Sequence, residues 1–548
     1  MVAPATVLYV VMLIVPVGLA LYLSLTDWDG FSADPAFVGA ANYVTLLDDP
    51  ELRRAALVTL LVAAAGTAGL NLCGLGFALL VNGASRLNTF FRIVLFYPHV
   101  LSALVVGFLW SAILGTTGAV NNLVTTWGGE VLPFLSDPTW ATVTMIAVLV
   151  WAGFGVNVVL YLAGLQAVPH SLIEAARIDG ATRWQVFRNV TLPALGPSVT
   201  VNVVLSLVTL LKTYDLVVSL TAGGPAGQTQ TVAYLILWNS FHDARLGFGS
   251  AQSVILMGGH GGAGVRGDEA AQARRAGGAP MRKTFLWAAA AFMLIPLYVL
   301  TVNAFKGQQD ILANPFGLGG LTLEPLGRAL TNPNFNVAKG YAITLLFVVA
   351  VNVLSVGLAA PAAYVIARSP KRRFRVLMLF FLAGTFIPGQ VLVIPVVYVL
   401  KTLGLMGTIR GFVLFETTLT LPFSIFLYAG YIATVPAVLD QAAAVDGAGR
   451  LRTFWQIVFP LMRPAVATMI ILNTFSVWND FVNPQIILGP GSGLYTVTTG
   501  VYAAVSQYST DYSVVFPTLL LAIAPLLVFF VFMQRHIISG LTAGATKG

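Results

Sequence analysis

The chain is dominated by apolar runs, each about as long as a helix that crosses a lipid bilayer. A hydrocarbon core roughly 30 Å thick needs about 20 apolar residues per helix. Only 9% of the 548 residues are charged, against about 25% in soluble domains. The sequence therefore predicts an all-α polytopic membrane protein with eleven spans, at residues 5–25, 56–81, 93–114, 141–166, 198–220, 284–304, 341–367, 376–400, 409–433, 464–488 and 513–534.

The basic residues set the expected orientation, because Lys and Arg gather in loops that face the cytoplasm. Of the 29 Lys and Arg residues, 20 fall in alternate loops and the segment after Arg535, and the segment SPKRRFR at 369–375 is the densest group. We assign these loops to the cytoplasm. Both termini are then expected on the cytoplasmic side.

An internal repeat organises the chain. The segment Glu174-Ala-Ala-Arg-Ile-Asp-Gly180-Ala returns 267 positions later as Gln441-Ala-Ala-Ala-Val-Asp-Gly447-Ala. A proline follows each glycine by 13 residues, at Pro193 and Pro460. Both copies follow the fourth span of their half on the same side. This predicts two parallel repeats of five to six helices each, related by an axis along the membrane normal.

Each repeated loop is predicted to form a helix–turn–helix. In the first copy Ser171-x-x-Glu174 fits a capping box that would start a short helix, and Asp179-Gly180 is a turn signal because glycine adopts positive φ. A short helix with a small-residue face suits a groove in a partner protein. The alternative is that both loops are amphipathic connectors resting on lipid headgroups.

The repeated loop resembles the EAA loop of permease subunits of binding-protein-dependent ABC importers. Residues 27–60 and LTAGGP at 220–225 resemble the first permease of the sugar-uptake branch, of the maltose and glycerol-3-phosphate type. WNDF at 478–481, LYTVTTG at 494–500 and the ending GLTAGATKG resemble its partner permease. Three departures stand out: both permeases share one chain, Gln441 replaces the motif's glutamate, and residues 258–280 do not match.

The resemblance implies a bacterial inner-membrane permease that forms a translocation pathway by alternating access. It implies three kinds of partner: two copies of a cytoplasmic ABC ATPase, an extracytoplasmic solute-binding protein, and a sugar, polyol or glycerol phosphate as substrate. It also assigns ATPase docking to the two loops. The residues carried over are Glu174, Ala175, Ala176, Asp179 and Gly180 in the first, and Gln441, Ala442, Ala443, Asp446 and Gly447 in the second.

Enzymatic chemistry is not indicated by any motif. The sequence lacks a G-x-x-x-x-G-K-[ST] phosphate loop, its five histidines have no metal-ligand spacing, and Cys73 is the single cysteine. We therefore expect no catalytic residues, no metal and no cofactor, with ATP bound by partner subunits. Nothing indicates a nucleic-acid partner; membrane lipid is expected around the spans.

The substrate pathway is expected near the ends of the fifth spans, since polar groups inside a membrane are costly. The candidates are Tyr214 and Asp215 in the first half, and Trp478, Asn479 and Asp480 in the second. An aromatic ring with amide and carboxylate groups suits a sugar. The alternative is that these residues, like Asn157 in the fourth span, bond helices to one another.

Two other functions fit the sequence less well. An ion-coupled secondary transporter with two parallel six-helix halves would carry ionisable residues deep in its spans, and these spans are almost uncharged. A membrane scaffold that does not transport would also show two docking loops. The identity of the sugar cannot be derived from the residues.

The sixth span of the first half is incomplete. The apolar run that matches the last helix stops after 246–257, and 12 residues reach about 18 Å at 1.5 Å per residue. Residues 258–280 are rich in Gly and Ala with five charged residues, a composition of flexible linkers. We predict a first permease half at 1–257, a linker at 258–280 and a second half at 281–548, joined by a frame shift or fusion near 257.

Overall fold

The computed structural model describes residues 1–32, 35–83, 85–261, 279–333, 335–385, 387, 389–507 and 511–545. These residues form helices and short connections, with two isolated β-bridges, Thr26–Phe37 and Lys306–Leu321. Each bridge closes the loop that follows the first long helix of a sequence half. The prediction of an all-α fold is confirmed.

The chain divides into two compact units, and each unit combines segments of both sequence halves. Unit 1 contains Met1–Leu52, Leu235–Gly262 and Asn336–Gly500. Unit 2 contains Arg53–Tyr234, Ala263–Phe335 and Val501–Gly548. Two short helices cross between the units along the chain, α14 (Val232–Leu237) and α28 (Val497–Gln507).

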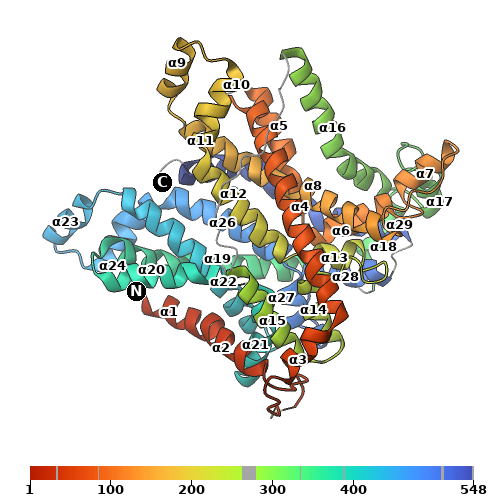
Figure 1. The fold of residues 1–548 in the computed structure, drawn as a ribbon. Coiled ribbons are helices and arrows are strands. Elements are labelled where there is room, and N and C mark those ends of the chain that lie inside the picture. Colours follow the sequence, from red (N-terminus) through yellow and green to blue (C-terminus); the bar gives the residue numbers. More distant parts are fainter. Residues whose placement is uncertain are drawn as a thin grey trace. The chain divides into compact units, whose positions relative to one another are not determined.

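Unit 1 is built around the second to fifth helical segments of the second half (Figure 1). Its helices and short π or 3₁₀ turns are α1 (Ala3–Tyr9), η1 (Val10–Ile14), α2 (Val15–Leu23), α3 (Ala41–Asp48), η4 (Trp238–His242), α15 (Leu246–Gly261), α19 (Val337–Arg368), α20 (Arg372–Thr385), α21 (Gly389–Thr402), α22 (Ile409–Thr434), α23 (Val438–Val445), α24 (Arg450–Thr453), η5 (Phe454–Val458), α25 (Phe459–Leu461), α26 (Arg463–Asn479), α27 (Val482–Ile487) and η6 (Pro490–Ser492).

The first helix of the chain packs within this unit, against helices of the second half. The Tyr9 hydroxyl donates to the Phe380 carbonyl at 2.9 Å, and its ring lies 4.8 Å from that of Phe381. Further along the chain, α2 packs against α21 and α15. Gly247 of α15 donates its amide to the Trp28 carbonyl at 2.8 Å. A Cβ there would lie 2.1 Å from the Thr26 carbonyl oxygen, so only glycine permits this approach.

Unit 2 is built around the corresponding segments of the first half, and it takes up the first and last helices of the second half. Its elements are α4 (Pro50–Val81, from Arg53 on), α5 (Arg86–Phe96), η2 (Tyr97–Val100), α6 (Ala103–Leu114), α7 (Ala119–Thr126), α8 (Pro138–Ala167), α9 (His170–Ile178), α10 (Arg183–Val186), η3 (Phe187–Thr191), α11 (Leu192–Ala194), α12 (Gly196–Leu211), α13 (Asp215–Leu220), α16 (Ala279–Asn303), α17 (Gln308–Ala313), α18 (Glu324–Leu330) and α29 (Tyr512–Ala545).

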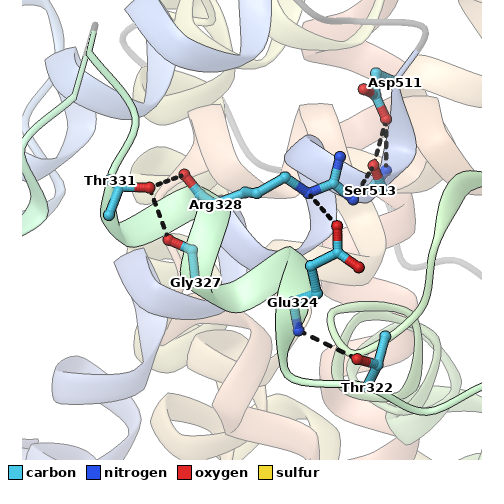
Figure 2. Close-up of polar contacts among 7 residues, drawn as sticks. All are labelled: Thr322, Glu324, Gly327, Arg328, Thr331, Asp511 and Ser513. Atoms are coloured by element: carbon cyan, nitrogen blue, oxygen red, sulfur yellow. Dashed lines mark hydrogen bonds and ion pairs between the residues drawn. The ribbon is translucent and has the colours of Figure 1, made fainter.

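Helices α16 and α29 are fastened to this unit by polar and aromatic contacts. The Tyr97 hydroxyl donates to the Met293 carbonyl of α16 at 2.5 Å. Figure 2 shows the start of α29, where Arg328 of α18 donates to the Ser513 hydroxyl at 3.4 Å and lies 3.8 Å from Glu324. Asp511 accepts from the Ser513 amide and hydroxyl, at 3.0 and 2.6 Å. A loop helix and the last long helix are thus held together.

Polar side chains join the long helices within each unit. In unit 2, Asn157 of α8 donates to the Ser206 hydroxyl of α12 at 3.0 Å, and Tyr161 donates to Asn71 of α4 at 2.7 Å. In unit 1, Thr420 of α22 donates to Ser355 of α19 at 3.0 Å. The expectation that Asn157 bonds helices together is confirmed.

The described residues contain eight helices that are long and apolar enough to cross a membrane, and ten if two bent pairs are counted as spans. The bent pairs are α10–α11 with α12, at 65°, and α24–α25 with α26, at 76°. The eighth predicted span, 376–400, is wrong as a single helix. It is divided into α20, which ends at Thr385, and α21, which begins at Gly389.

The expected apolar segment 246–257 lies in α15, whose described residues continue four positions further, to Gly261. The first four residues of the predicted linker, 258–261, therefore belong to this helix. Residues 262–278 lie outside the described residues, and with them the predicted length of the sixth span and most of the predicted linker.

Candidate functional site

The two repeated loops have the same helix ending. Helix α9 is followed by Gly180 with φ 79°, and α23 by Gly447 with φ 75°. The Gly180 amide donates to the Arg177 carbonyl at 3.1 Å, and the Ala181 amide to that of Ala176 at 3.0 Å. This pair of bonds is a Schellman motif.

The second loop repeats the motif bond for bond. Gly447 donates to the Ala444 carbonyl at 3.1 Å, and Ala448 to that of Ala443 at 2.8 Å. The repeated sequence therefore has a local physical reason. Alanine favours the helix, the second alanine of the repeat supplies an accepting carbonyl, and glycine takes the left-handed turn that most side chains would strain.

The predicted capping box at Ser171 and Glu174 is wrong. Helix α9 starts directly after Pro169, whose extended backbone forms the N-cap without a side-chain hydrogen bond. A capping box does occur at the next helix, α10. The Gln185 amide donates to the Thr182 hydroxyl at 3.3 Å, and the Thr182 amide donates to the Gln185 side chain at 2.7 Å. The sequence T-x-x-Q was the available signal.

Most of the predicted docking residues lie on the surface of their unit. Glu174, Ala175, Asp179 and Gly180 are exposed and Ala176 is half-buried; Gln441, Ala442, Asp446 and Gly447 are exposed and Ala443 is buried.

Apolar side chains are exposed beside them at matching positions. Ile178 is 85% exposed, and its counterpart Val445 is 88% exposed. Leu172 and Leu439 form a second matched pair, at 50% and 37%. Each loop thus presents the same small apolar surface, of the kind that enters a partner's groove.

Only the second loop carries an acidic anchor among the described contacts. Asp440 of α23 accepts from the Tyr364 hydroxyl of α19 at 2.5 Å. The Arg368 guanidinium lies 3.0 Å from the other Asp440 oxygen and donates to the Val435 carbonyl at 2.9 Å. In the first loop the position corresponding to Asp440 is Ile173. The end of α19 and the second loop are therefore fastened by charge.

The predicted pathway residues of the second half lie where its fifth helix breaks. Helix α26 ends at Asn479, Asp480 is extended with ψ 128°, and α27 begins at Val482. The ring centroid of Trp478 lies 6.2 Å from that of Tyr341. An interrupted helix exposes backbone polar groups, and such breaks occur in membrane proteins where they line a cavity or are buried in protein.

A buried carboxyl from α22 meets this break, and sequence reasoning missed it. Glu416 is 3% exposed and accepts from the Asn483 side chain at 3.2 Å. Asp480 accepts from the Asn483 amide at 3.3 Å, and the Thr498 hydroxyl donates to the Asp480 carbonyl at 2.5 Å. The available signal was a lone glutamate inside the apolar run 409–433. An ionisable side chain inside a membrane span is costly, so such a residue is a candidate for a functional role.

The corresponding break of the first half has a different character. Helix α12 ends at Leu211 and α13 begins at Asp215, with Tyr214 between them. The Tyr214 ring lies 6.1 Å from that of Tyr234. The Thr231 hydroxyl donates to the Thr213 carbonyl freed by the break, at 2.7 Å. In each half the structure thus brings the predicted residues to a broken helix.

Metal-binding chemistry is not evident at either break. Within the described residues, no group of three or more His, Cys, Asp or Glu side chains has the arrangement of a metal site.

Comparison with known proteins gives a consistent picture. The family described as "Binding-protein-dependent transport system inner membrane component" matches residues 71–307 and 356–542. The chain is 35% identical over 260 residues to the multiple sugar-binding transport system permease protein MsmG of Streptococcus mutans, covering 46% of this chain and 92% of that protein. It is 34% identical over 260 residues to the sn-glycerol-3-phosphate transport system permease protein UgpA of Brucella abortus, covering 46% and 87%.

Among solved structures, the chain resembles a bacterial ABC transporter involved in the import of the acidic polysaccharide alginate. The identity is 20%, the TM-score is 0.40, and the match covers 47% of this chain and 95% of that one. Each relative is thus matched over most of its own length by less than half of this chain.

Proposed function

This chain belongs to the family of binding-protein-dependent transport system inner membrane components, and we propose that it unites both permeases of one ATP-driven sugar importer. The substrate is a sugar or a related polyol or glycerol phosphate. The names of the relatives support this class, since MsmG serves a multiple sugar-binding system and UgpA serves sn-glycerol-3-phosphate.

The observation that carries the proposal is the pair of matched loops. Each ends α9 or α23 in the same Schellman turn and exposes the same apolar pair, Leu172 with Ile178 and Leu439 with Val445. Two equal surfaces suit two copies of one partner. In our proposal each loop binds a cytoplasmic ABC ATPase subunit, which supplies the ATP hydrolysis that this chain has no phosphate loop to perform.

A solute-binding protein on the opposite side delivers the substrate, and ATPase closure pushes on both loops to drive alternating access. Docking is assigned to the ten residues named above. Because Gln441 lacks the carboxylate of Glu174, the second dock depends less on charge and more on Leu439 and Val445. A fixed Asp440–Arg368 pair then transmits the push to α19.

The substrate route passes the two helix breaks. Trp478, Asn479 and Asp480 line it in the second half, with Glu416 and Asn483 as further hydrogen-bonding groups. Tyr214 and Asp215 line it in the first half. Indole stacked on a sugar ring, together with amide and carboxyl groups that bind hydroxyls, gives the chemistry that a neutral sugar requires.

Cross-linking tests the docking assignment directly, because Cys73 is the single native cysteine. In a Cys73→Ser background, one cysteine is placed at Ala175, at Ala442, or at the exposed control residue Thr322. A bifunctional thiol reagent should join the first two variants to the ATPase and leave the Thr322→Cys variant unlinked. Cross-links from all three positions, or from the control alone, would overturn the assignment.

A further inference from the structure

A pocket of about 360 Å³ opens within unit 1 where the end of α19, the start of α20 and the last third of α22 meet. Its wall is apolar, formed by Ile366, Met378 and Phe426. Its rim is basic, formed by Lys371 and Arg375. None of the described residues that line it is acidic. The pocket therefore joins an apolar surface to uncompensated positive charge.

The apolar wall is open and continues onto the outer surface of unit 1. Phe426 is 48% exposed, and its neighbour Phe423 is 42% exposed. On α20, Leu379 is 62% exposed. Gly430 adds to the opening, because a Cβ built on it would meet no atom within 4 Å. On helices that cross a membrane, exposed side chains of this kind contact acyl chains.

Within the part of the chain that the structure describes, the basic rim forms no ion pair with an acidic side chain. Lys371 and Arg375 are both exposed, and the first turn of α20 contains no acidic residue. Arg372 and Arg373 stand in the same turn outside the pocket, with the Arg373 guanidinium 4.9 Å from the centre of the Phe374 ring. Basic pockets between helices at a membrane surface attract anionic headgroups, because a low-dielectric wall strengthens the attraction.

We propose that this pocket binds one anionic phospholipid. The phosphate lies between Lys371 and Arg375, and one acyl chain follows Met378 and Phe426 past Gly430. Ala367 lines the pocket, and the next residue is Arg368, which holds Asp440 of the second loop at 3.0 Å. A bound lipid therefore supports the helix end that anchors this loop, which goes beyond the proposed transport function.

Binding of a fluorescent phosphatidylglycerol to the purified full-length chain tests the proposal. The double variant Lys371→Gln/Arg375→Gln removes the two rim charges. Arg372→Gln/Arg373→Gln removes the same charge from the same turn outside the pocket. We expect roughly 10- to 30-fold weaker binding for the first variant and less than about twofold change for the second. Equal weakening by both variants would mean a diffuse basic surface and would overturn the site.

A second pair of variants tests the pocket without changing charge. Gly430→Leu fills the open wall, whereas Gly357→Leu adds the same side chain to an open, exposed position on α19 away from the pocket. Only Gly430→Leu should reduce binding of the lipid. Competition separates a lipid from a free phosphate: unlabelled phosphatidylglycerol should displace the probe, and phosphatidylcholine and glycerol phosphate should not. Displacement by glycerol phosphate alone would contradict a lipid occupant.

Discussion

At the scale of single residues, Gly180 and Gly447 determine how the two loops turn. Both have positive φ, and a Cβ at either position would meet no atom within 4 Å. A substitution therefore acts through the backbone alone, without a clash.

We expect Gly180→Val or Gly447→Val to strain the Schellman turn by about 1–2 kcal/mol and to uncouple ATP hydrolysis from transport, with membrane insertion unchanged. Asparagine tolerates this conformation, so Gly180→Asn should retain most of the coupling. Uptake and ATPase assays on the same vesicles measure coupling, as the ratio of substrate transported to ATP hydrolysed. Normal coupling in both valine variants would show that the loops do not transmit the push.

Asp440 provides a second residue-scale prediction. Removing its charge in Asp440→Asn leaves Arg368 without its ion-pair partner, and both side chains are only 19% exposed. We expect the free energy of opening of α23 to fall by about 1–3 kcal/mol, seen as faster amide hydrogen exchange in Val438–Val445.

Helix α9 of the same variant is the internal control, because Ile173 holds the matching position there. A further Arg368→Gln change should add little, since both residues belong to one interaction. Exchange that rises equally in α9 and α23 would point to general destabilisation and against a specific anchor.

Single residues also show where prediction from sequence failed. The sequence marks Glu416 as unusual, but only the tertiary structure brings it beside Asn483 and the break at Asp480. The sequence pattern places a capping box at Ser171, because it does not show that Pro169 is the N-cap and that α9 already begins at His170. Both errors concern partners set by the folded backbone.

At the scale of elements, the proposed substrate route passes the breaks of the fifth helices. Trp478→Ala and Asp480→Ala should lower the initial rate of uptake by roughly tenfold or more. A loss of this size corresponds to the free energy of one charged hydrogen bond or one stacked ring. Expression and ATPase binding should change by less than about twofold. Ser476→Ala, at an exposed position of the same helix, is the matched control. If uptake falls only in proportion to the amount of protein expressed, these residues have a structural role and do not contact the substrate.

Hydropathy located most helices but not their interruptions. The runs near 93–114 and 376–400 read as single helices, yet each is divided, at Tyr97–Val100 and between Thr385 and Gly389. An apolar residue has the same hydropathy in a straight helix and in a break. Hydropathy therefore does not show where an apolar run is interrupted. The loop turns were predictable because Asp-Gly encodes a local backbone conformation.

At the scale of the whole molecule, the two units exchange their first helices. Tyr9 and Trp28 of the first half pack in unit 1, the latter with its ring 5.3 Å from that of Tyr398. Trp287 of the second half packs in unit 2, 5.2 Å from Phe91. Neither sequence half contains a complete unit. The repeat predicted the number of bundles but not which helices complete them, because that depends on long-range packing.

Separate expression of residues 1–257 and 281–548 tests this exchange. Each half alone should be degraded or aggregated, because it exposes the surface that the other half's first helix covers. The two halves expressed together should co-purify. A stable, monodisperse half on its own would show that the exchange is not needed for folding.

The sixth span of the first half gives a related expectation. Because the apolar run of the sequence stops after 246–257, replacing the residues that follow it with an apolar segment should raise the yield of assembled protein. Expressing 281–548 beside a first permease with a complete sixth helix should do the same. An unchanged yield in both cases would mean that the sequence after 257 is adequate as it stands.

Substrate uptake by the full chain reconstituted with its ABC ATPase and binding protein tests the central claim most directly. Labelled sugar should enter vesicles only when ATP and the binding protein are both present, on opposite sides of the membrane. An imposed proton or sodium gradient without ATP should drive no uptake. Uptake that follows the ion gradient and ignores ATP would contradict the account and favour an ion-coupled transporter.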